Sequence, residues 1–454
     1  MSFMPNNVKL AFYGGAGTIG GNAVSLTFDK NSKSESYFFD FGVEQQKLAR
    51  HKSLGGTLES LEQLQRWGFL PELPKTDIRA CFISHAHPDH CYALSALTKS
   101  SLAPRDIWAS NTTNQMIQGK KLLARNWNLC IEPFEKTSYY EDKNVRVAPF
   151  PTDHNIPGAC AYLTRFADQV VVYTGDFREH GSLSRDMGDQ FWKYVKRTSK
   201  KSDNITLITE GTNFGLPHKC ITEHDIQERV KEVLSNSSDQ LLLVIVSDRD
   251  IWRLMTILEA LKQAEPKRKL IVAPKLAGTI NHLSEQIRSD YKDVLQPTVF
   301  DLYSKNILFL QKSMFADSPA YKSGLSVVAE KPSQHVILAT RAEGFQSCED
   351  LFSYMRYRDL CGCCILSLSE YVEQESGSST NDYARSISEL GLSVEEAHSC
   401  GHIFPTRLVE IIQELNPKGI YLIHTIAPDG LRRFIKGRTG IDAITPKVGE
   451  QYSL

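Results

Sequence analysis

The stretch Ser84-His-Ala-His-Pro-Asp-His90 brings three imidazoles and one carboxylate together within a few residues. Its pattern is His-x-His-x-Asp-His, and imidazole nitrogens and carboxylate oxygens both bind borderline divalent ions such as zinc. Two such ions about 4 Å apart can hold the attacking and leaving oxygens of a phosphate displacement. A histidine-rich surface loop is the alternative interpretation. The stretch therefore favours a two-metal hydrolytic site, provided that further ligands follow along the chain.

Further metal-type residues follow segments that have the pattern of buried strands. These segments are 78–84, 169–173 and 418–423. The first runs into the histidine stretch, the second is followed by Asp176, and the third is followed by His424. Nearly continuous β-branched runs are typical of strands covered on both faces, and ligand sites of α/β proteins collect beyond the carboxyl ends of strands. We therefore expect these residues to meet at one place.

The chain also resembles a known family. A His-x-His-x-Asp-His motif, then the lone His154, then Gly-Asp176 and a late His424, is similar to the pattern of the metallo-β-lactamase superfamily. The later motifs resemble the β-CASP branch of nucleic-acid-processing nucleases, and most of all ribonuclease J. The matching motifs are Gly14-Gly-Ala-Gly-Thr-Ile-Gly-Gly-Asn22, Phe39-Asp-Phe-Gly42, Asp153-His-Asn-Ile-Pro157, Tyr173-Thr-Gly-Asp-Phe177, Thr209-Glu-Gly-Thr-Asn213, His398-Ser-Cys-Gly-His402 and Leu422-Ile-His424.

The order of the motifs predicts a discontinuous first domain. Strand-like segments, such as 241–246, and helix-like segments, such as 276–291, alternate between residues 213 and 386, which implies a parallel sheet with helical cover. Because His424 lies beyond this segment, the first domain resumes after it. The expected fold is α/β, an αββα metallo-β-lactamase sandwich with an inserted α/β β-CASP cap domain and an active site in the cleft between them. The expected limits are 1–212 and 387–454 for the sandwich and 213–386 for the insert.

The resemblance implies a role for each metal-type residue. The implied ligands are His85, His87 and His154 for one metal, Asp89, His90 and His424 for the other, and Asp176 as the bridge between them. Two divalent ions are expected, zinc first, with manganese left open. A hydroxide held between the metals would attack phosphorus, and Asp89 is counted among the catalytic residues for this reason.

The family motifs also place a general acid near the metals. The resemblance implies that His402 protonates the departing oxygen and that Glu210 orients it. A surface or capping acid is the alternative for Glu210. Ser399 and Cys400, together with His402, are the expected contacts of a substrate phosphate, with Cys400 in place of the serine usual in the family.

Helix signals agree with this arrangement. Thr222 is expected to cap a helix, with Asp225 in the capping-box position. Pro405 suits the first turn of a second helix that starts just after His402, where exposed backbone N–H groups favour an anion. For three neighbouring residues a role without chemistry is favoured or left open. His398 is expected to form a structural hydrogen bond and His180 to lie in a loop, while Asp153 either supports His154 or is exposed.

The resemblance also suggests a class of substrate. In β-CASP proteins the position of His424 is usually histidine in RNA-processing members, so single-stranded RNA is favoured. An exonuclease and an endonuclease are both open, as are a DNA nuclease, a hydrolase of small esters or phosphodiesters, and a binding subunit without activity. A homo-oligomer is also left open.

Composition is consistent with a cytoplasmic enzyme. The formal net charge of −1 speaks mildly against a wide basic surface that grips nucleic acid. No secretory signal and no stretch of about 18 apolar residues is evident, so no membrane association is expected. The ten cysteines lack the density of a disulfide scaffold, and free or buried thiols are favoured over a metal site for the group at 361–364.

Overall fold

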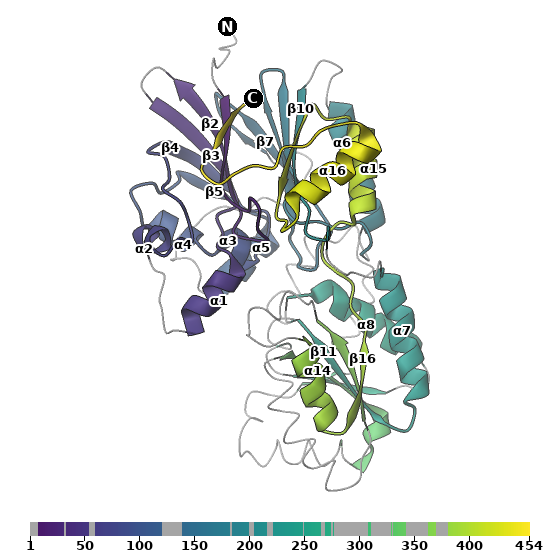
Figure 1. Cartoon of the computed structure of the whole chain (residues 1–454). Coiled ribbons are helices and arrows are strands. Elements are labelled where there is room, and N and C mark those ends of the chain that lie inside the picture. Colours follow the sequence, from purple (N-terminus) through teal and green to yellow (C-terminus); the bar gives the residue numbers. More distant parts are fainter. Residues whose placement is uncertain are drawn as a thin grey trace. The chain divides into compact units, whose positions relative to one another are not determined.

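The computed structural model describes most of the chain, in two compact units. The described residues are 8–30, 33–53, 60–119, 139–181, 184–198, 204–215, 221–247, 249–264, 268–273, 276, 307–309, 328, 330–341, 362–368 and 380–454. The first unit comprises Met1–Glu179, Leu183–Lys219 and Gly401–Leu454, and the second comprises His180–Ser182 and Cys220–Cys400. The first unit is thus discontinuous (Figure 1). The limits near 212 and 387 stay predictions from the sequence.

The first unit contains two six-stranded sheets. One has the order β18-β1-β2-β3-β4-β5, and its strands are β1 (Val8–Gly14), β2 (Ala23–Lys30), β3 (Lys33–Phe39), β4 (Asp77–Phe82), β5 (Asp106–Trp108) and β18 (Gln451–Ser453). The other has the order β17-β10-β9-β8-β7-β6, and its strands are β6 (Tyr140–Glu141), β7 (Arg146–Pro151), β8 (Cys160–Phe166), β9 (Gln169–Tyr173), β10 (Asn204–Glu210) and β17 (Gly419–Ile423).

Parallel pairing brings the carboxyl ends of the ligand-bearing strands to a common edge. In the second sheet β10 pairs in parallel with both β9 and β17. β8 is antiparallel to both β9 and β7, so β7 runs in the same direction as β9. In the first sheet β3, β4 and β5 are mutually parallel. Residues that follow β7, β9, β10 and β17 therefore emerge at one end of their sheet, as those after β3 and β4 do in theirs.

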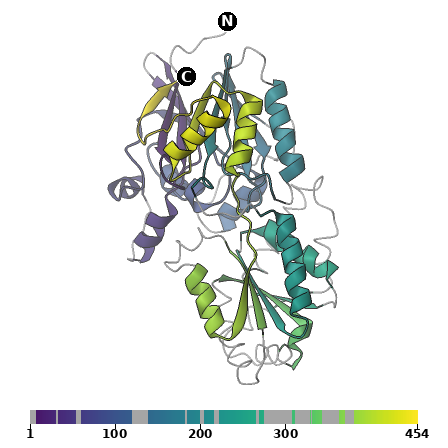
Figure 2. The ribbon, with the colours of Figure 1, turned by 45° about the vertical axis from the view of Figure 1, so that its right-hand side comes forward.

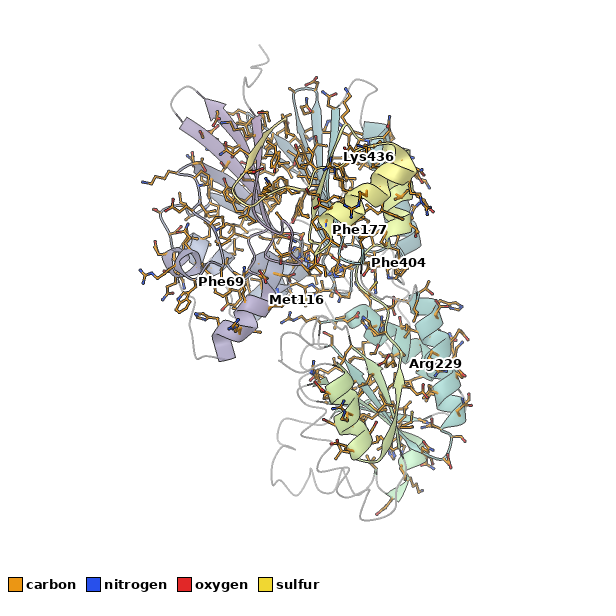
Figure 3. The ribbon with its side chains drawn as sticks, in the orientation of Figure 1. Phe69, Met116, Phe177, Arg229, Phe404 and Lys436 are labelled. Atoms are coloured by element: carbon orange, nitrogen blue, oxygen red, sulfur yellow. The ribbon has the colours of Figure 1, made fainter. Side chains whose placement is uncertain are left out.

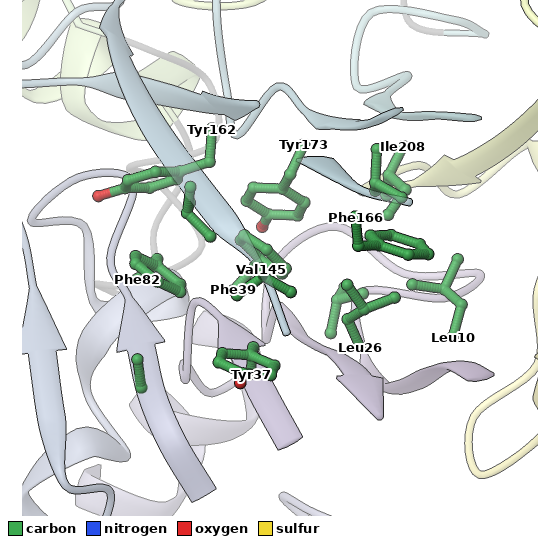
Figure 4. Close-up of a cluster of buried hydrophobic side chains, with 14 of the residues drawn as sticks. Leu10, Leu26, Tyr37, Phe39, Phe82, Val145, Tyr162, Phe166, Tyr173 and Ile208 are labelled. Atoms are coloured by element: carbon green, nitrogen blue, oxygen red, sulfur yellow. The ribbon is translucent and has the colours of Figure 1, made fainter. Parts of the chain in front are cut away.

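Large apolar side chains fill the space between the two sheets. Leu10 and Leu26 on the first sheet face Phe166 and Ile208 on the second (Figure 4). Burial of each such side chain contributes roughly 1.5–3 kcal/mol to folding. Tyr173 belongs to the same cluster, and its ring is fully buried. This core fixes the two sheets against each other and so sets the spacing of the loops at their carboxyl ends.

Helices lie outside the sheets. Beside the first sheet are α1 (Gln45–Ser53), α2 (Leu61–Arg66), α3 (Pro88–Cys91), α4 (Leu94–Thr98) and α5 (Asn111–Gly119) (Figure 1). Against the outer face of the second sheet pack α6 (Ser184–Thr198), α15 (Pro405–Leu415) and α16 (Pro428–Thr439). Phe177 is buried in this layer, whereas Lys436 on α16 is exposed (Figure 3). The unit is thus an α/β sandwich with its helices outside.

The second unit has one parallel sheet with the order β13-β12-β14-β11-β15-β16. Its elements are α7 (Glu223–Asn236), β11 (Leu241–Val246), α8 (Ile251–Gln263), β12 (Lys269–Val272), β13 (Ile307–Phe309), a 3₁₀ turn at Pro332–Gln334, β14 (His335–Thr340), β15 (Gly362–Ser367), α14 (Thr380–Glu389) and β16 (Leu392–Glu396). Alternate side chains of β11 pack against α7 and α8 on one face of the sheet and against α14 on the other. The ribbon shows these helices on the two sides of the sheet (Figure 2).

Most of the elements predicted from the sequence are confirmed. The strands at 169–173 and 241–246 have the predicted bounds. Thr222 caps α7 in a capping box with Asp225, and Pro405 is the first residue of α15. The predicted helix from 276 to 291 lies outside the described residues apart from Leu276. Among the helices that the structure describes, none combines the length and the apolar character needed to cross a membrane.

Candidate metal centre

The predicted metal ligands all lie in the first unit, in loops at the carboxyl ends of strands. His85 and His87 follow β4, and Asp89 and His90 lie in the single turn α3, where Pro88 occupies the first helical position. His154 follows β7, Asp176 follows β9, and His424 directly follows β17. All except His87 are buried. The structure therefore brings together every metal ligand that was proposed from the sequence.

Three histidines form the first cluster. Nε2 of His85 lies 2.9 Å from Nδ1 of His87, and Nε2 of His154 lies 3.2 Å from the same Nδ1 atom. A tetrahedral zinc ion with bonds of about 2.0–2.1 Å separates its ligand nitrogens by about 3.3 Å. Burial, together with the neighbouring imidazoles, lowers the pKa of His85 well below its usual value, and burial lowers the pKa of His154 to about 3. Both rings are therefore neutral and offer lone pairs to a metal.

The second cluster combines two histidines and two carboxylates. Oδ2 of Asp176 lies 3.1 Å from Nε2 of His90 and 3.5 Å from Nε2 of His424, and Oδ2 of Asp89 lies 3.1 Å from Nε2 of His424. The same Asp176 oxygen is 3.9 Å from Nε2 of His85 in the first cluster. Asp176 therefore stands between the two groups of ligands, as a bridging residue must.

The side chains suit divalent metal ions. Oδ1 of Asp176 is buried, and no hydrogen bond satisfies it within the described residues. Burial of such an oxygen costs free energy unless a cation or a donor compensates it. The donors are imidazole nitrogens and carboxylate oxygens, which suit zinc or manganese. The buried histidine and aspartate clusters are therefore consistent with metal binding.

His90 would exchange a proton for a metal. Burial alone would lower the pKa of His90, but the neighbouring carboxylates, above all Asp176, raise it well above its usual value. In the metal-free protein this ring is consequently protonated at neutral pH. Because only the neutral ring binds a metal, acidic conditions weaken metal binding.

Hydrogen bonds from the remote ring nitrogens orient the ligands. Nδ1 of His85 lies 3.0 Å from the Ser84 hydroxyl, and Nδ1 of His154 lies 2.5 Å from the backbone carbonyl of Gly401. Nδ1 of His90 lies 2.6 Å from Oδ2 of Asp40. Each contact takes the Nδ1 atom and leaves Nε2 for the metal cluster. Such contacts raise the basicity of the ligand and fix its tautomer.

Asp40 is a functional residue that the sequence interpretation missed. It follows β3 and is fully buried, with a left-handed backbone at φ +57°. Oδ1 accepts a hydrogen bond from the Ser84 backbone at 2.6 Å, and Oδ2 accepts from the hydroxyls of Ser84 at 2.7 Å and Tyr173 at 2.6 Å. Next to it, a Cβ on Gly42 would lie 1.8 Å from the carbonyl oxygen of Asp89. The Phe39-Asp-Phe-Gly42 motif was noticed, and the glycine close to the aspartate was the available signal.

Asp40→Asn should weaken metal binding by about 10- to 100-fold. All four groups that contact the Asp40 carboxylate donate hydrogen bonds to it. The amide nitrogen of the asparagine would therefore face at least one of these donors, and His90 would lose its charged partner. The affinity can be measured by competition with a chromogenic chelator. Asp29→Asn, on β2 and bonded to Ser34, is the control. Equal metal affinity of Asp40→Asn and the wild type would contradict the assignment.

A histidine–carboxylate pair lies next to the metal ligands. Nδ1 of His402 is 2.8 Å from Oε2 of Glu210 and 3.8 Å from Oδ2 of Asp176. Glu210 is the last residue of β10 and is fully buried, and its Oε1 accepts a hydrogen bond from the Phe177 backbone at 2.9 Å. Burial alone would lower the pKa of His402, but Glu210, ahead of Asp176, raises it to about 9. With no metal bound, this raised pKa favours the protonated ring at neutral pH.

The loop before His402 belongs to the second unit up to Cys400. The Ser399 hydroxyl donates to the Ile221 carbonyl at 2.7 Å, and Sγ of Cys400 lies 3.5 Å from Nε2 of His180. Nδ1 of His398 lies 3.3 Å from Nη1 of Arg253. The predicted phosphate contacts Ser399, Cys400 and His402 are thus divided between the units and stay a prediction.

A further neighbour of the ligands, Asp153, has a structural partner. Asp153 forms a fully buried ion pair with Arg178 at 3.1 Å, beside the backbone of His154. Cys363 and Cys364 on β15 are buried, whereas Cys361 lies outside the described residues.

Comparisons with known proteins give distant relatives. No protein-family model matches the chain. Ribonuclease J of Mycoplasma genitalium is 24% identical over 309 residues, which are 66% of this chain and 51% of the relative. Ribonuclease J of Mycoplasma pneumoniae is 23% identical over 282 residues (62% and 46%), and ribonuclease J 2 of Staphylococcus aureus is 22% identical over 249 residues (51% and 41%). The matches span about half the length of these relatives or less.

A solved structure matches the whole chain. It is that of a protein of unknown function from Enterococcus faecalis V583, with a TM-score of 0.68 and 18% identity, over 99% of this chain and 100% of the other. The predicted fold class, an α/β sandwich with an inserted α/β unit, is confirmed. By sequence, the chain is a distant relative of ribonuclease J.

Proposed function

We propose that the chain is a metal-dependent nuclease that hydrolyses phosphodiester bonds, with single-stranded RNA as its substrate. The observation that carries the proposal is the position of the charged His402–Glu210 pair, 3.8 Å from the Asp176 carboxylate between the two ligand clusters. A phosphodiester needs an activated water, neutralised phosphoryl oxygens and a proton for the departing oxygen. The relationship to ribonuclease J supports RNA as the polymer. A cytoplasmic location belongs to the same proposal.

The proposed ligand sets follow the clusters. They are His85, His87 and His154 for one metal and Asp89, His90 and His424 for the other, with Asp176 shared. Two divalent ions, zinc in the first place, would supply Lewis-acid activation of water and neutralise charge on the phosphoryl oxygens. The Asp89 carboxylate, 3.1 Å from Nε2 of His424, would be a ligand in the second set.

His402 is the proposed general acid. Its Nδ1 atom is occupied by Glu210 at 2.8 Å, which leaves the Nε2–H group for the departing oxygen. The adjacent Glu210 carboxylate raises the pKa of His402 and so favours the protonated ring. Asn213 donates a hydrogen bond to the His402 backbone carbonyl at 2.7 Å and so holds the residue in place. Glu210 therefore acts as a positioning residue, and His402 carries the proton.

The test is a denaturing gel of end-labelled substrates. Single-stranded RNA carrying a 5′-monophosphate or a 5′-triphosphate is compared with DNA of the same sequence, in zinc, in manganese and in chelator. We expect metal-dependent cleavage of RNA. Mononucleotides from 5′-monophosphate RNA would indicate a 5′ exonuclease, and internal fragments an endonuclease. Metal-loaded protein that cleaves only DNA, or only a small chromogenic diester, would overturn the RNA assignment.

A further inference from the structure

Thr212 lies between the metal ligands and the proposed acid pair. It follows the last residue of β10 by two positions, and only 1% of its surface is exposed. Its hydroxyl lies 2.6 Å from Oε2 of Glu210 and 2.7 Å from Nδ1 of His424. One threonine oxygen therefore contacts both the carboxylate that faces His402 and a ligand of the second metal cluster.

The number of protons on each group determines which atoms donate and which accept in these hydrogen bonds. A hydroxyl has one proton, and an ionised carboxylate only accepts hydrogen bonds. At 2.6 Å from Glu210, the Thr212 hydroxyl must donate to the carboxylate, because two oxygen lone pairs would otherwise repel each other. The same oxygen can then only accept from Nδ1 of His424. His424 is thereby fixed as the Nδ1–H tautomer, and its Nε2 lone pair points to the cluster of Asp89 and Asp176.

We propose that Thr212 is a positioning residue that couples the metal centre to the general acid. The chain of contacts runs from His424 through Thr212 to Glu210, which also accepts the hydrogen bond of His402. A single buried carboxylate thus orients the acid directly and a metal ligand through the threonine. The part that concerns His402 rests on the proposed function, whereas the part that concerns His424 rests only on metal binding.

The backbone conformation of His424 makes its contact with Thr212 more important. His424 has a left-handed backbone at φ +51°, a conformation that is costly for a residue other than glycine. Its N–H donates to the Gly15 carbonyl at 2.7 Å, and its Nδ1–H donates to the Thr212 hydroxyl. Gly15 and Thr212 therefore hold His424 from two sides, so that the imidazole position is fixed before a metal binds.

The test compares Thr212→Val with Thr212→Ser in the full chain. Valine keeps the shape of threonine but removes the hydroxyl, and serine keeps the hydroxyl. The matched control is Thr164→Val, a fully buried threonine of β8 whose hydroxyl makes no hydrogen bond within the described residues. Cobalt(II) affinity is measured by chelator competition, and the cobalt absorption spectrum reports the ligand geometry.

We expect Thr212→Val to bind cobalt about 10- to 100-fold more weakly, with an altered spectrum. Thr212→Ser and Thr164→Val should bind as the wild type does. With metal saturating, Thr212→Val should also cleave RNA with a lower kcat and an unchanged KM. If Thr212→Val does not fold, Thr212→Ala removes the same hydroxyl without a new methyl group and gives the same comparison with serine.

The two proposals fail in different ways. Cobalt affinity and spectrum of Thr212→Val equal to those of Thr164→Val would overturn the role of Thr212, whatever the protein cleaves. A wild-type protein that cleaves no RNA, with Thr212→Val still impaired in cobalt binding, would remove the nuclease proposal and leave the positioning of His424 intact.

Discussion

Asp176→Ala is expected to abolish RNA cleavage, with a rate loss of roughly three orders of magnitude or more. The Asp176 carboxylate lies within 4 Å of ring nitrogens of both clusters, at 3.1 Å from His90 and 3.9 Å from His85. Its second oxygen is buried without a hydrogen bond in the described chain. The variant loses the only side chain shared by the two ligand sets, so bound metal per chain should fall together with the activity.

The control for this variant is Asp442→Ala. Asp442 is an exposed acid that pairs with Arg432 and Lys436 on α16 and is none of the proposed ligands. It should retain both activity and metal. Metal content by elemental analysis and initial cleavage rates are measured on the same preparations. An Asp176→Ala protein that cleaves within about tenfold of the wild type would exclude the bridging role.

His402→Ala should lower the cleavage rate by about 10²- to 10⁴-fold at unchanged metal content. His402 is not among the seven proposed ligands, and its Nδ1 atom is bonded to Glu210. Removal of the ring takes away the proton donor but leaves both ligand clusters complete. Glu210→Gln should reduce the rate as well, and the double variant should be little worse than His402→Ala, because the two residues act as one unit.

Substrate chemistry separates a general acid from a residue with a merely structural role. In a small p-nitrophenyl diester, the p-nitrophenolate leaving group departs without taking up a proton. His402→Ala should therefore cleave this diester nearly as fast as the wild type does. His224→Ala, which changes an exposed histidine of α7, is the control for loss of an imidazole. An equal loss on RNA and on the activated diester, with metal retained, would show that His402 does not supply the proton.

Much of the site was accessible from the sequence because its chemistry is local. Asp89 and His90 share one helical turn, and Asp176 and His424 each follow a strand whose β-branched run marks it as buried. Parallel pairing of β9, β10 and β17 then converts similar positions along three strands into proximity in space. Periodicity and residue type therefore sufficed to predict that these ligands meet.

The residues that orient the ligands could not be found in this way. Asp40 precedes His90 by 50 positions, and Thr212 precedes His424 by 212. Each of these contacts depends on how two loops pack at the ends of different strands, which no local pattern encodes. Aspartate and threonine are also common in turns, so their residue types alone carry little signal. The strained backbones of Asp40 and His424 likewise become visible only in the structure.

The most direct test follows activity and metal together. Protein stripped with a chelator is titrated with zinc or manganese, and bound metal and the RNA cleavage rate are measured at every step. The proposed mechanism predicts no cleavage without metal and a rate that rises until about two ions are bound per chain, with the Asp176→Ala protein inactive throughout. Cleavage by the stripped protein at the full rate, or fully occupied protein that leaves RNA, DNA and the activated diester intact, would contradict it.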